Sequence, residues 1–302
     1  MQRDVPTPRS GEVLIRVAAS GLNRADLSQI AGRYPPPSGE SEVLGLEVSG
    51  WIADSKQPVC ALLAGGGHAE YVAAPAGQVF PAPQAIELVA AGGIPEAYLT
   101  AYVNLVVEAG LGSGDRVLVH AGASGVGLAA IQVAKLLGAQ VAATTRTREK
   151  LTAMEEAGAD IVFDTTQTDV ETELERRWGA NCVAVVLNSI GGASLATDLR
   201  LLATGGRIVC IASMAGPKIE LEIPLLMRKR ARLIGSTLRA RPREEKARLV
   251  AGFKEQILPA LDAGRLRVHV HSIVPPEQAA AAFQALRDNQ TTGKVLIQWE
   301  RT

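Results

Sequence analysis

An apolar strand that runs into a glycine-rich turn is the feature that most constrains this chain. The segment reads Asp115-Arg-Val-Leu-Val-His-Ala-Gly-Ala-Ser-Gly-Val-Gly-Leu-Ala-Ala. The spacing Gly125-x-Gly127-x-x-Ala130 opens a helix whose free N–H groups and positive dipole end can bind a pyrophosphate. A glycine string alone is weak evidence, but strand, turn, helix and second strand follow here in the order of one βαβ unit. The sequence therefore predicts a dinucleotide site.

The ribose end of that site is basic and hydroxylic. An acidic residue usually stands about twenty residues after the first glycine and accepts hydrogen bonds from the ribose. Counting from Gly125 leads instead to Thr144, Thr145, Arg146, Thr147, Arg148 and Lys150. Charge-assisted hydrogen bonds from such residues suit a 2′-phosphate, so we expect NADPH in preference to NADH. The alternative is a solvated basic helix start, which the helix dipole disfavours.

The pattern of expected secondary structure changes near residue 97. Before it, strands expected at residues 12–19, 43–52 and 69–73 are separated by proline and glycine clusters. After it, short apolar strands alternate with helices, which is typical of a parallel sheet covered on both faces. The expected strands of this part are 116–120, 140–144, 160–163, 182–187, 206–212 and 232–236. The expected helices are 126–137, 149–157, 170–178 and 193–202, followed by 243–261, another after Pro275-Pro276, and a final strand at 294–299.

Composition excludes several classes of function. The 31 basic and 31 acidic residues balance, and only 4% of residues are aromatic, so neither nucleic acid nor anionic lipid is an expected partner. The cysteines Cys60, Cys182 and Cys210 are far apart, which argues against a disulfide framework or a metal knuckle and fits a reducing compartment. No long apolar run or secretory leader is visible. We expect a cytoplasmic protein with a small-molecule substrate.

Ordered motifs extend along nearly the whole chain. They are Ala18-Ala-Ser-Gly-Leu-Asn-Arg-Ala-Asp-Leu, Tyr34-Pro-Pro-Pro, Leu44-Gly-Leu-Glu-Val-Ser-Gly, Ala61-Leu-Leu-Ala-Gly-Gly-Gly-His-Ala-Glu-Tyr, Ile94-Pro-Glu-Ala-Tyr-Leu-Thr-Ala-Tyr, His120-Ala-Gly-Ala-Ser-Gly-Val-Gly, Leu187-Asn-Ser-Ile-Gly-Gly, Leu238-Arg-Ala-Arg and Gly293-Lys. Together they resemble the zinc-free quinone oxidoreductases of the medium-chain dehydrogenase/reductase superfamily. The branch of the tumour-suppressor-inducible quinone oxidoreductase is the most similar.

This resemblance implies an α/β fold with two domains. A GroES-like, β-rich catalytic domain would be built from residues 1–97 and 239–302, around an inserted Rossmann domain, a doubly wound parallel sheet over residues 98–238 that binds NADPH. The cofactor would lie in the cleft between the domains. Relatives commonly form a homodimer through the edge strand of the Rossmann sheet, here expected at residues 232–236.

The resemblance also implies chemistry without a metal. Zinc-dependent relatives have a cysteine at the place of Asn23 and a histidine at that of Leu46, and the chain's 4 histidines lack the spacing of a rebuilt tetrahedral site. Without an ion to polarise a carbonyl, we expect hydride transfer to a quinone or related conjugated carbonyl rather than alcohol oxidation. An enoyl-thioester reductase and a non-catalytic, NADPH-binding crystallin-like protein are the alternatives.

Two neutral hydrogen-bond donors are the expected catalytic residues. By resemblance, the Tyr34 hydroxyl and the Asn23 amide lie beside the nicotinamide, where they can donate to the acceptor oxygen or to the nicotinamide amide. The alternatives are a turn tyrosine packed on the prolines that follow it and an asparagine that satisfies local backbone.

The expected cofactor contacts are spread over the chain. The pyrophosphate would meet Ala123, Ser124, Gly125, Val126 and Gly127, and the adenosine phosphate would meet Thr145, Arg146, Thr147 and Lys150. Later strand ends supply Asn188, Ser189, Ile190, Ala212, Ser213 and Met214, and resemblance adds Leu238, Arg239, Arg241 and Lys294. Arg146 could instead cover the adenine as a lid, and Arg239 with Arg241 could be a solvated surface pair.

Two regions are shorter than in the family. One is the segment that corresponds to a hairpin in relatives, Trp51-Ile-Ala-Asp-Ser-Lys-Gln-Pro-Val-Cys, and the other is the region before Val5. Either the chain is a compact variant or residues are missing from it.

Overall fold

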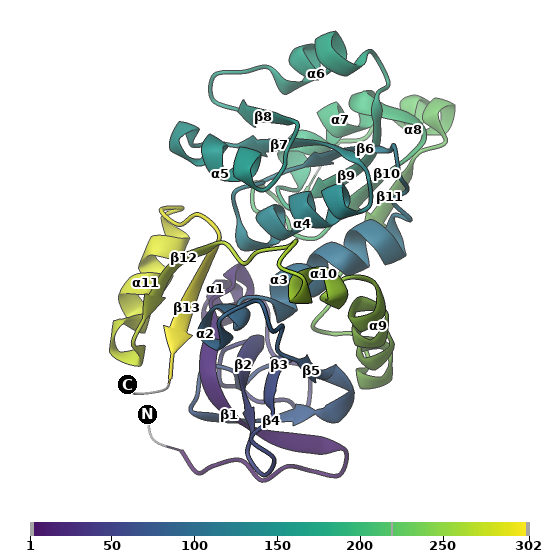
Figure 1. Cartoon of the computed structure of the whole chain (residues 1–302). Coiled ribbons are helices and arrows are strands. Elements are labelled where there is room, and N and C mark those ends of the chain that lie inside the picture. The colour runs from purple at the N-terminus through teal and green to yellow at the C-terminus, as the bar shows by residue number, and fades with distance from the viewer. Residues whose placement is uncertain (1–2, 219, 300–302) are drawn as a thin grey trace. The chain divides into compact units, whose positions relative to one another are not determined.

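The computed structural model describes residues 3–218 and 220–299. The chain divides into two compact units, of which the first is built from the residues up to Leu99 and those from Leu238 onward. The second unit spans Thr100–Thr237. Each unit contains its own sheet, and the strands of both sheets are labelled in Figure 1.

The second unit is a parallel sheet with helices. Its order is β11-β10-β9-β6-β7-β8, and every neighbouring pair is parallel. The strands are β6 (Arg116–Val119), β7 (Gln140–Thr145), β8 (Ile161–Asp164), β9 (Val183–Asn188), β10 (Leu202–Cys210) and β11 (Arg232–Gly235). The chain reverses its direction of travel across the sheet between β6 and β9, which is the switch point where doubly wound sheets bind ligands. This is the Rossmann arrangement, as expected.

Helices of the second unit bury apolar faces against that sheet. They are α4 (Gly125–Leu136), α5 (Leu151–Glu156), α6 (Val170–Trp178), α7 (Gly192–Leu201) and α8 (Ile223–Lys229), with a π-helix at Val103–Glu108 and a 3₁₀ turn at Arg148–Lys150. One core cluster joins Leu118 and Val186 of the strands to Leu195 and Leu199 of α7. Burying each such side chain stabilises the folded state by about 2 kcal/mol, which holds these helices to the sheet.

The first unit is a mostly antiparallel, seven-stranded sheet, in the order β12-β13-β1-β2-β3-β5 with β4 paired to β1. The strands are β1 (Glu12–Gly21), β2 (Glu47–Ile52), β3 (Pro58–Leu62), β4 (Tyr71–Pro75), β5 (Val79–Pro81), β12 (Val270–Val274) and β13 (Lys294–Gln298). β1 pairs with β13, with Ala19 opposite Gln298, so the two ends of the chain share one sheet. Residues at alternate positions form its core, namely Ile15, Val17, Val59, Ala61, Val72 and Ala74.

The helices of the first unit are α1 (Arg24–Ile30), α2 (Leu88–Ala91), α9 (Arg243–Gln256), α10 (Leu258–Asp262) and α11 (Ala279–Arg287), with 3₁₀ turns at Ala76–Gln78 and Pro276–Gln278. The boundary between the units falls after Leu99, within α3 (Pro95–Tyr102), so the first half of α3 also belongs to the first unit. No helix among the described residues is both long and apolar enough to cross a bilayer.

The expected α/β fold class is confirmed, but several element boundaries were wrong. The helix expected over 243–261 ends at Gln256 and restarts as α10, because Pro259 lacks the N–H that a continuous helix needs. The strand expected from Val43 begins only at Glu47, since residues 43–45 accept hydrogen bonds from the backbone of residues 66–68 instead of pairing in the sheet. Strands β5 and β12 were not expected.

The short segment between β2 and β3 is a closed turn. The Lys56 N–H donates to the Ile52 carbonyl over 2.8 Å, and the Ile52 N–H donates to the Gln57 carbonyl over 3.0 Å. Lys56 has a φ of 56°, in the left-handed region. The two strands are therefore joined by a tight connection with its own hydrogen bonds.

Candidate functional site

The glycine-rich turn joins the end of β6 to the start of α4. Ala121 has a φ of 49°, a left-handed conformation that non-glycine residues seldom adopt outside tight turns. The Gly122 N–H donates to the Thr144 carbonyl over 2.8 Å, and the Ser124 N–H donates to the Ala121 carbonyl over 3.0 Å. The turn is thereby tied to the adjacent strand β7 before the helix begins.

Gly127 lets the first turn of α4 lie against this backbone. A Cβ atom at Gly127 would stand 2.4 Å from the Ala121 carbonyl oxygen and 2.6 Å from that of Gly122. The Ser124 hydroxyl accepts the Gly127 N–H over 3.0 Å and so caps the helix. The N–H groups of Gly125 and Val126 have no intrahelical partner and are free to bind an anion.

The predicted adenosine end lies beyond β7. Thr145 is the last residue of β7 and is buried, and its hydroxyl accepts the Thr147 N–H over 3.3 Å. Arg146 is exposed, and no residue in the described ranges forms a hydrogen bond or ion pair with its guanidinium. Lys150, by contrast, is buried in the 3₁₀ turn that precedes α5. Arg146 is therefore a cation that is available to a phosphate from solvent.

The two predicted segments at later strand ends lie side by side. The Ala215 N–H donates to the Ile190 carbonyl over 2.7 Å, and the Ile211 N–H donates to the Asn188 carbonyl over 2.9 Å. A Cβ atom at Gly191 would stand 2.6 Å from the Cα of Ser213. The structure thus brings residues 188–190 together with residues 212–214 at the carboxyl ends of β9 and β10, where Ala212, Ser213 and Met214 are exposed.

A buried polar network that the sequence reasoning missed supports this edge. His120 Nε2 lies 2.7 Å from Asp198 Oδ1, and His120 Nδ1 lies 3.0 Å from the Thr144 hydroxyl. The Asn188 amide donates to Asp198 Oδ2 over 2.6 Å, while its oxygen accepts the N–H groups of Ile190 and Gly191. The signal for it was an acidic residue, Asp198, between leucines on the buried face of α7.

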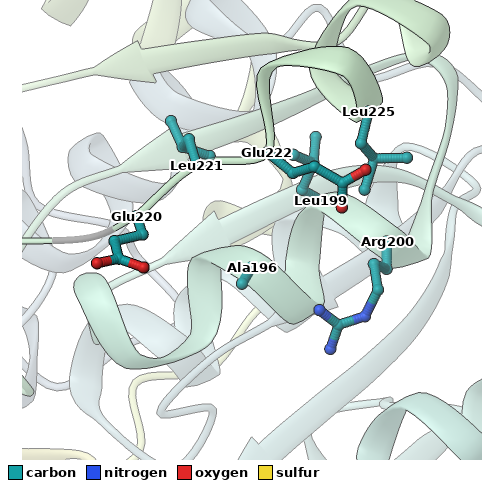
Figure 2. Close-up of a pocket in the computed structure, with 7 residues that line it drawn as sticks. All are labelled: Ala196, Leu199, Arg200, Glu220, Leu221, Glu222 and Leu225. Atoms are coloured by element: carbon teal, nitrogen blue, oxygen red, sulfur yellow. The ribbon is translucent and has the colours of Figure 1, made fainter.

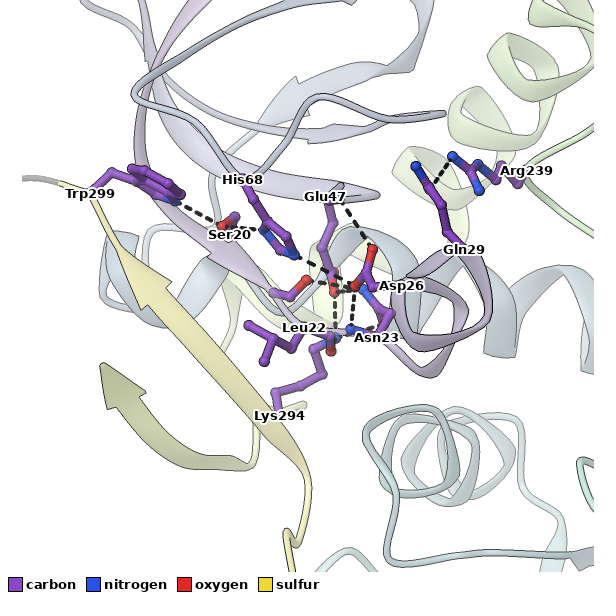
Figure 3. A network of polar contacts seen from close by, with 12 residues as sticks. Ser20, Leu22, Asn23, Asp26, Gln29, Glu47, His68, Arg239, Lys294 and Trp299 are labelled. Carbon is purple, nitrogen blue, oxygen red and sulfur yellow. Dashed lines mark hydrogen bonds and ion pairs between the residues drawn. The ribbon is translucent and has the colours of Figure 1, made fainter. Parts of the chain in front are cut away.

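The first unit holds a second polar cluster, centred on Glu47 (Figure 3). The Lys294 ammonium donates to Glu47 Oε1, to the Asn23 amide oxygen over 2.9 Å and to the Leu22 carbonyl over 3.0 Å. The Glu96 N–H donates to Glu47 Oε2 over 2.9 Å. Lys294 and Glu47 are both buried, so each charge depends on the other and on these hydrogen bonds. All three protons of the Lys294 ammonium are used within the cluster.

Asn23 is held at the start of α1. Its backbone N–H donates to Asp26 Oδ2 over 2.8 Å. Its side-chain amide donates to the Gly21 carbonyl over 3.1 Å and to Glu47 Oε1 over 2.9 Å. Both amide protons and the amide oxygen of Asn23 therefore have partners inside the cluster.

Tyr34 differs from Asn23, because its hydroxyl is bonded to no residue in the described part of the chain. The Arg239 guanidinium lies over the Tyr34 ring, 5.2 Å from its centroid, and donates to the Tyr34 carbonyl over 3.0 Å. It also donates to the Ala64 carbonyl and to Gln29 Oε1, both over 2.7 Å. Burial, assisted by the charge of Glu96, raises the pKa of Tyr34, so the phenol stays protonated and can donate.

Arg239 is not a solvated surface residue. Its side chain is only 4% exposed, which overturns the surface-pair alternative for this position. Its burial is balanced by the three acceptors named above. Arg241 forms an ion pair with Glu245 over 2.8 Å, and Leu238 is buried.

A separate cavity of about 330 Å³ lies along α7 and α8 in the second unit (Figure 2). Its lining consists of Ala196, Leu199, Arg200, Glu220, Leu221, Glu222 and Leu225. Arg200 is already paired with Glu171 over 2.7 Å. None of the predicted site residues lines this cavity, so it is not the candidate site.

Comparisons with known proteins agree with this architecture. A family model described as a zinc-binding dehydrogenase matches residues 125–254, and one described as an alcohol dehydrogenase GroES-like domain matches residues 9–65. Quinone oxidoreductase of Lama guanicoe is 30% identical over 304 residues, which cover 97% of this chain and 90% of that protein. The chain belongs to the medium-chain dehydrogenase/reductase superfamily.

Solved structures of this superfamily match end to end. The quinone oxidoreductase from Thermus thermophilus, whose structures include a complex with NADPH, has a TM-score of 0.85 at 33% identity, covering 99% of this chain and 95% of that one. An NAD-dependent alcohol dehydrogenase has a TM-score of 0.86 at 28% identity, with coverage of 99% and 95%. Relatives of this chain thus include proteins named for either nicotinamide cofactor.

Although one matching family is described as zinc-binding, the described residues contain no group of three or more His, Cys, Asp or Glu side chains arranged to hold a metal. His68 Nε2 lies 3.6 Å from Asp26 Oδ2, and His68 Nδ1 forms a 2.8 Å hydrogen bond with the Ser20 hydroxyl (Figure 3).

Proposed function

We propose that this protein is a reductase that uses NADPH to reduce quinones or related conjugated carbonyls. The observation that carries the proposal is the α4 N-terminus, where free N–H groups of Gly125 and Val126 stand on a turn that only glycine at position 127 permits. The relatives named as quinone oxidoreductases, one of them solved with NADPH, support the same reading. The finer placement in the tumour-suppressor-inducible branch is part of this proposal.

The second unit, Thr100–Thr237, binds the cofactor and corresponds to the Rossmann domain expected over residues 98–238. Ala123, Ser124, Gly125, Val126 and Gly127 hold the pyrophosphate, and Thr145, Arg146, Thr147 and Lys150 hold the adenosine end. Residues 188–190 and 212–214 contact the nicotinamide half, in the position that the His120–Asp198 network gives them. When bound, NADPH supplies the hydride.

The first unit, which corresponds to the catalytic domain expected over residues 1–97 and 239–302, contributes the groups that meet the acceptor. The Tyr34 hydroxyl is the donor to the acceptor oxygen, because it is protonated and has no partner within the described residues. Asn23 and Lys294 act by fixing Glu47 and the start of α1, since their own donors are already used. Arg239 fixes Tyr34 from its ring face and its carbonyl.

An acceptor panel tests this function. NADPH oxidation is measured with small ortho- and para-quinones and with a crotonyl thioester, each with NADPH and with NADH. We expect quinone reduction that is faster with NADPH. Saturation of the thioester with negligible quinone turnover would instead establish the enoyl-thioester reductase. NADPH binding with no turnover of any acceptor would establish a non-catalytic binding protein.

We further propose a homodimer formed through β11. This strand lies at the edge of the parallel sheet, and its Leu233 side chain is 43% exposed. An unpaired edge with an exposed leucine is a surface that a second copy can cover.

The unpaired cysteines Cys60, Cys182 and Cys210 are in keeping with a cytoplasmic protein.

A further inference from the structure

A run of three glycines in the first unit is packed against neighbouring backbone. This glycine segment, residues 64–67, lies beside residues 41–45, and the Gly66 N–H donates to the Val43 carbonyl over 2.7 Å. A Cβ atom at Gly65 would stand 2.3 Å from a carbonyl oxygen of residues 41–45. Glycine at position 65 therefore permits a close approach of two backbones, and the glycine segment is held in place by that contact.

Arg239 joins the glycine segment to Tyr34. Its guanidinium donates to the Ala64 carbonyl over 2.7 Å and to the Tyr34 carbonyl over 3.0 Å. The same guanidinium lies over the Tyr34 ring, 5.2 Å from the ring centroid. One planar, rigid group thus spans the gap between the glycine segment and the turn that carries Tyr34, and it sets the separation of the two.

Arg239 is fixed at both of its ends. Its guanidinium, which is buried, also donates to Gln29 Oε1 over 2.7 Å (Figure 3), and the Gln29 amide donates to the Glu42 carbonyl over 2.9 Å. Its backbone carbonyl accepts the Lys246 ammonium over 3.2 Å. The turn that begins at Tyr34 is therefore tied to the glycine segment at its start by Arg239 and at its end by backbone hydrogen bonds.

We propose that Arg239 is a specificity-determining residue, which limits the size of the acceptor by fixing the separation between the glycine segment and Tyr34. The inference rests on the proposed function, which places the acceptor oxygen at the Tyr34 hydroxyl. An acceptor bound there meets a wall that cannot yield while Arg239 holds it. Arg239 acts by positioning, because its guanidinium is committed to Ala64, Tyr34 and Gln29.

The test compares wild type with Arg239→Lys, Gln29→Ala and the control Arg248→Lys. A lysine keeps the charge but is a point donor that cannot span three acceptors. Gln29→Ala removes only one of these acceptors and decides the test if circular dichroism shows that Arg239→Lys does not fold. Arg248 is an exposed arginine of α9. The kcat and KM with NADPH are measured for benzoquinone, which has one ring, and for phenanthrenequinone, which has three.

Arg239→Lys should raise the ratio of kcat/KM for phenanthrenequinone to that for benzoquinone about tenfold, because pocket size discriminates by such factors. It should also lower kcat for benzoquinone about tenfold, since a displaced donor is a poorer catalyst. Gln29→Ala should change both values in the same direction by about threefold. Fluorescence titration should show an unchanged Kd for NADPH in all variants, and Arg248→Lys should match wild type throughout.

A double-mutant cycle separates positioning of Tyr34 from general loss of structure. In a Tyr34→Phe background, Arg239→Lys should lower kcat for benzoquinone by about twofold at most, because the hydroxyl that Arg239 positions is already absent. Losses that multiply in full in the double variant would overturn the positioning role.

Hydrogen–deuterium exchange tests the same contact without turnover. The amides of residues 34–45 and 64–68 should exchange faster in Arg239→Lys than in wild type, both segments together, and at the wild-type rate in Arg248→Lys. An unchanged ratio for the two quinones, or weaker NADPH binding without a change in that ratio, would overturn the specificity role and leave the reductase intact. A wild type that reduces neither quinone with NADPH would overturn both proposals.

Discussion

His120 Nε2 lies 2.7 Å from Asp198 Oδ1, and both side chains are buried in the parallel-sheet unit. This contact joins the residue that follows β6 to the middle of α7. The second oxygen of Asp198 accepts the Asn188 amide over 2.6 Å. One carboxylate thereby fixes the strand ends on which two predicted segments of the cofactor site depend.

Asp198→Ala should lower the free energy of unfolding by about 3–5 kcal/mol, because His120 and Asn188 would lose a buried partner. Urea denaturation measures this change, and fluorescence titration should show weaker NADPH binding. The control is Glu173→Gln, which removes an exposed ion pair with Arg176 and should change stability by about 0.5 kcal/mol or less. A loss for Asp198→Ala no larger than the control's would contradict the structural role.

Arg146→Ala should weaken NADPH binding about tenfold and leave NADH binding unchanged, since a charge-assisted bond to a 2′-phosphate is worth about 1.5–3 kcal/mol. Titrations at low and high salt measure the effect, which should shrink as salt screens the charge. Arg177→Ala, an exposed arginine of α6, is the matched control. Equal losses for the two cofactors would indicate that Arg146 covers the adenine instead.

Tyr34→Phe should lower kcat with a quinone about a hundredfold, because one hydrogen-bond donor to the developing oxyanion is removed. Steady-state kinetics measure kcat, and NADPH titration should show an unchanged Kd. Tyr71→Phe, on β4 of the same unit, is the control and should keep wild-type activity. An active Tyr34→Phe variant would assign Tyr34 to packing of its turn.

The stability of the protein should fall as pH rises from about 5 to 8. Glu96 keeps its proton up to about pH 8 in the folded chain, whereas an ordinary glutamate loses it near pH 4.3. Between these values the unfolded state binds fewer protons, so the folded state loses stability with rising pH through this group. Urea unfolding at several pH values should give a flatter profile for Glu96→Gln than for wild type. Identical profiles would show that Glu96 ionises normally.

Leu233→Lys should convert the expected dimer into a monomer, because a charge on the exposed edge strand β11 would be buried against the second copy. Size-exclusion chromatography with light scattering measures the mass of each variant. Ile273→Lys, an exposed apolar residue of the other sheet, is the control and should leave the mass unchanged. A monomeric wild type would remove the proposed interface.

The sequence by itself determined the parallel-sheet unit and its phosphate-binding turn. Their signals are local: the apolar strand before Ala121, the spacing of Gly125 and Gly127, and the helix that follows all lie within about one βαβ unit. Local patterns specify backbone conformation directly. The α/β class and the position of the candidate cofactor turn were therefore readable without coordinates.

Only the tertiary structure decided what the polar residues do. Lys294 and Glu47 are 247 positions apart, and Arg239 and Tyr34 are 205 positions apart. No periodicity or spacing encodes such pairs, because they form only when distant parts of the chain meet, as when β1 pairs with β13 beside Lys294. Folding used the donors of Lys294 and Asn23 inside the Glu47 cluster and left the Tyr34 hydroxyl and the Glu96 carboxyl without partners among the described residues.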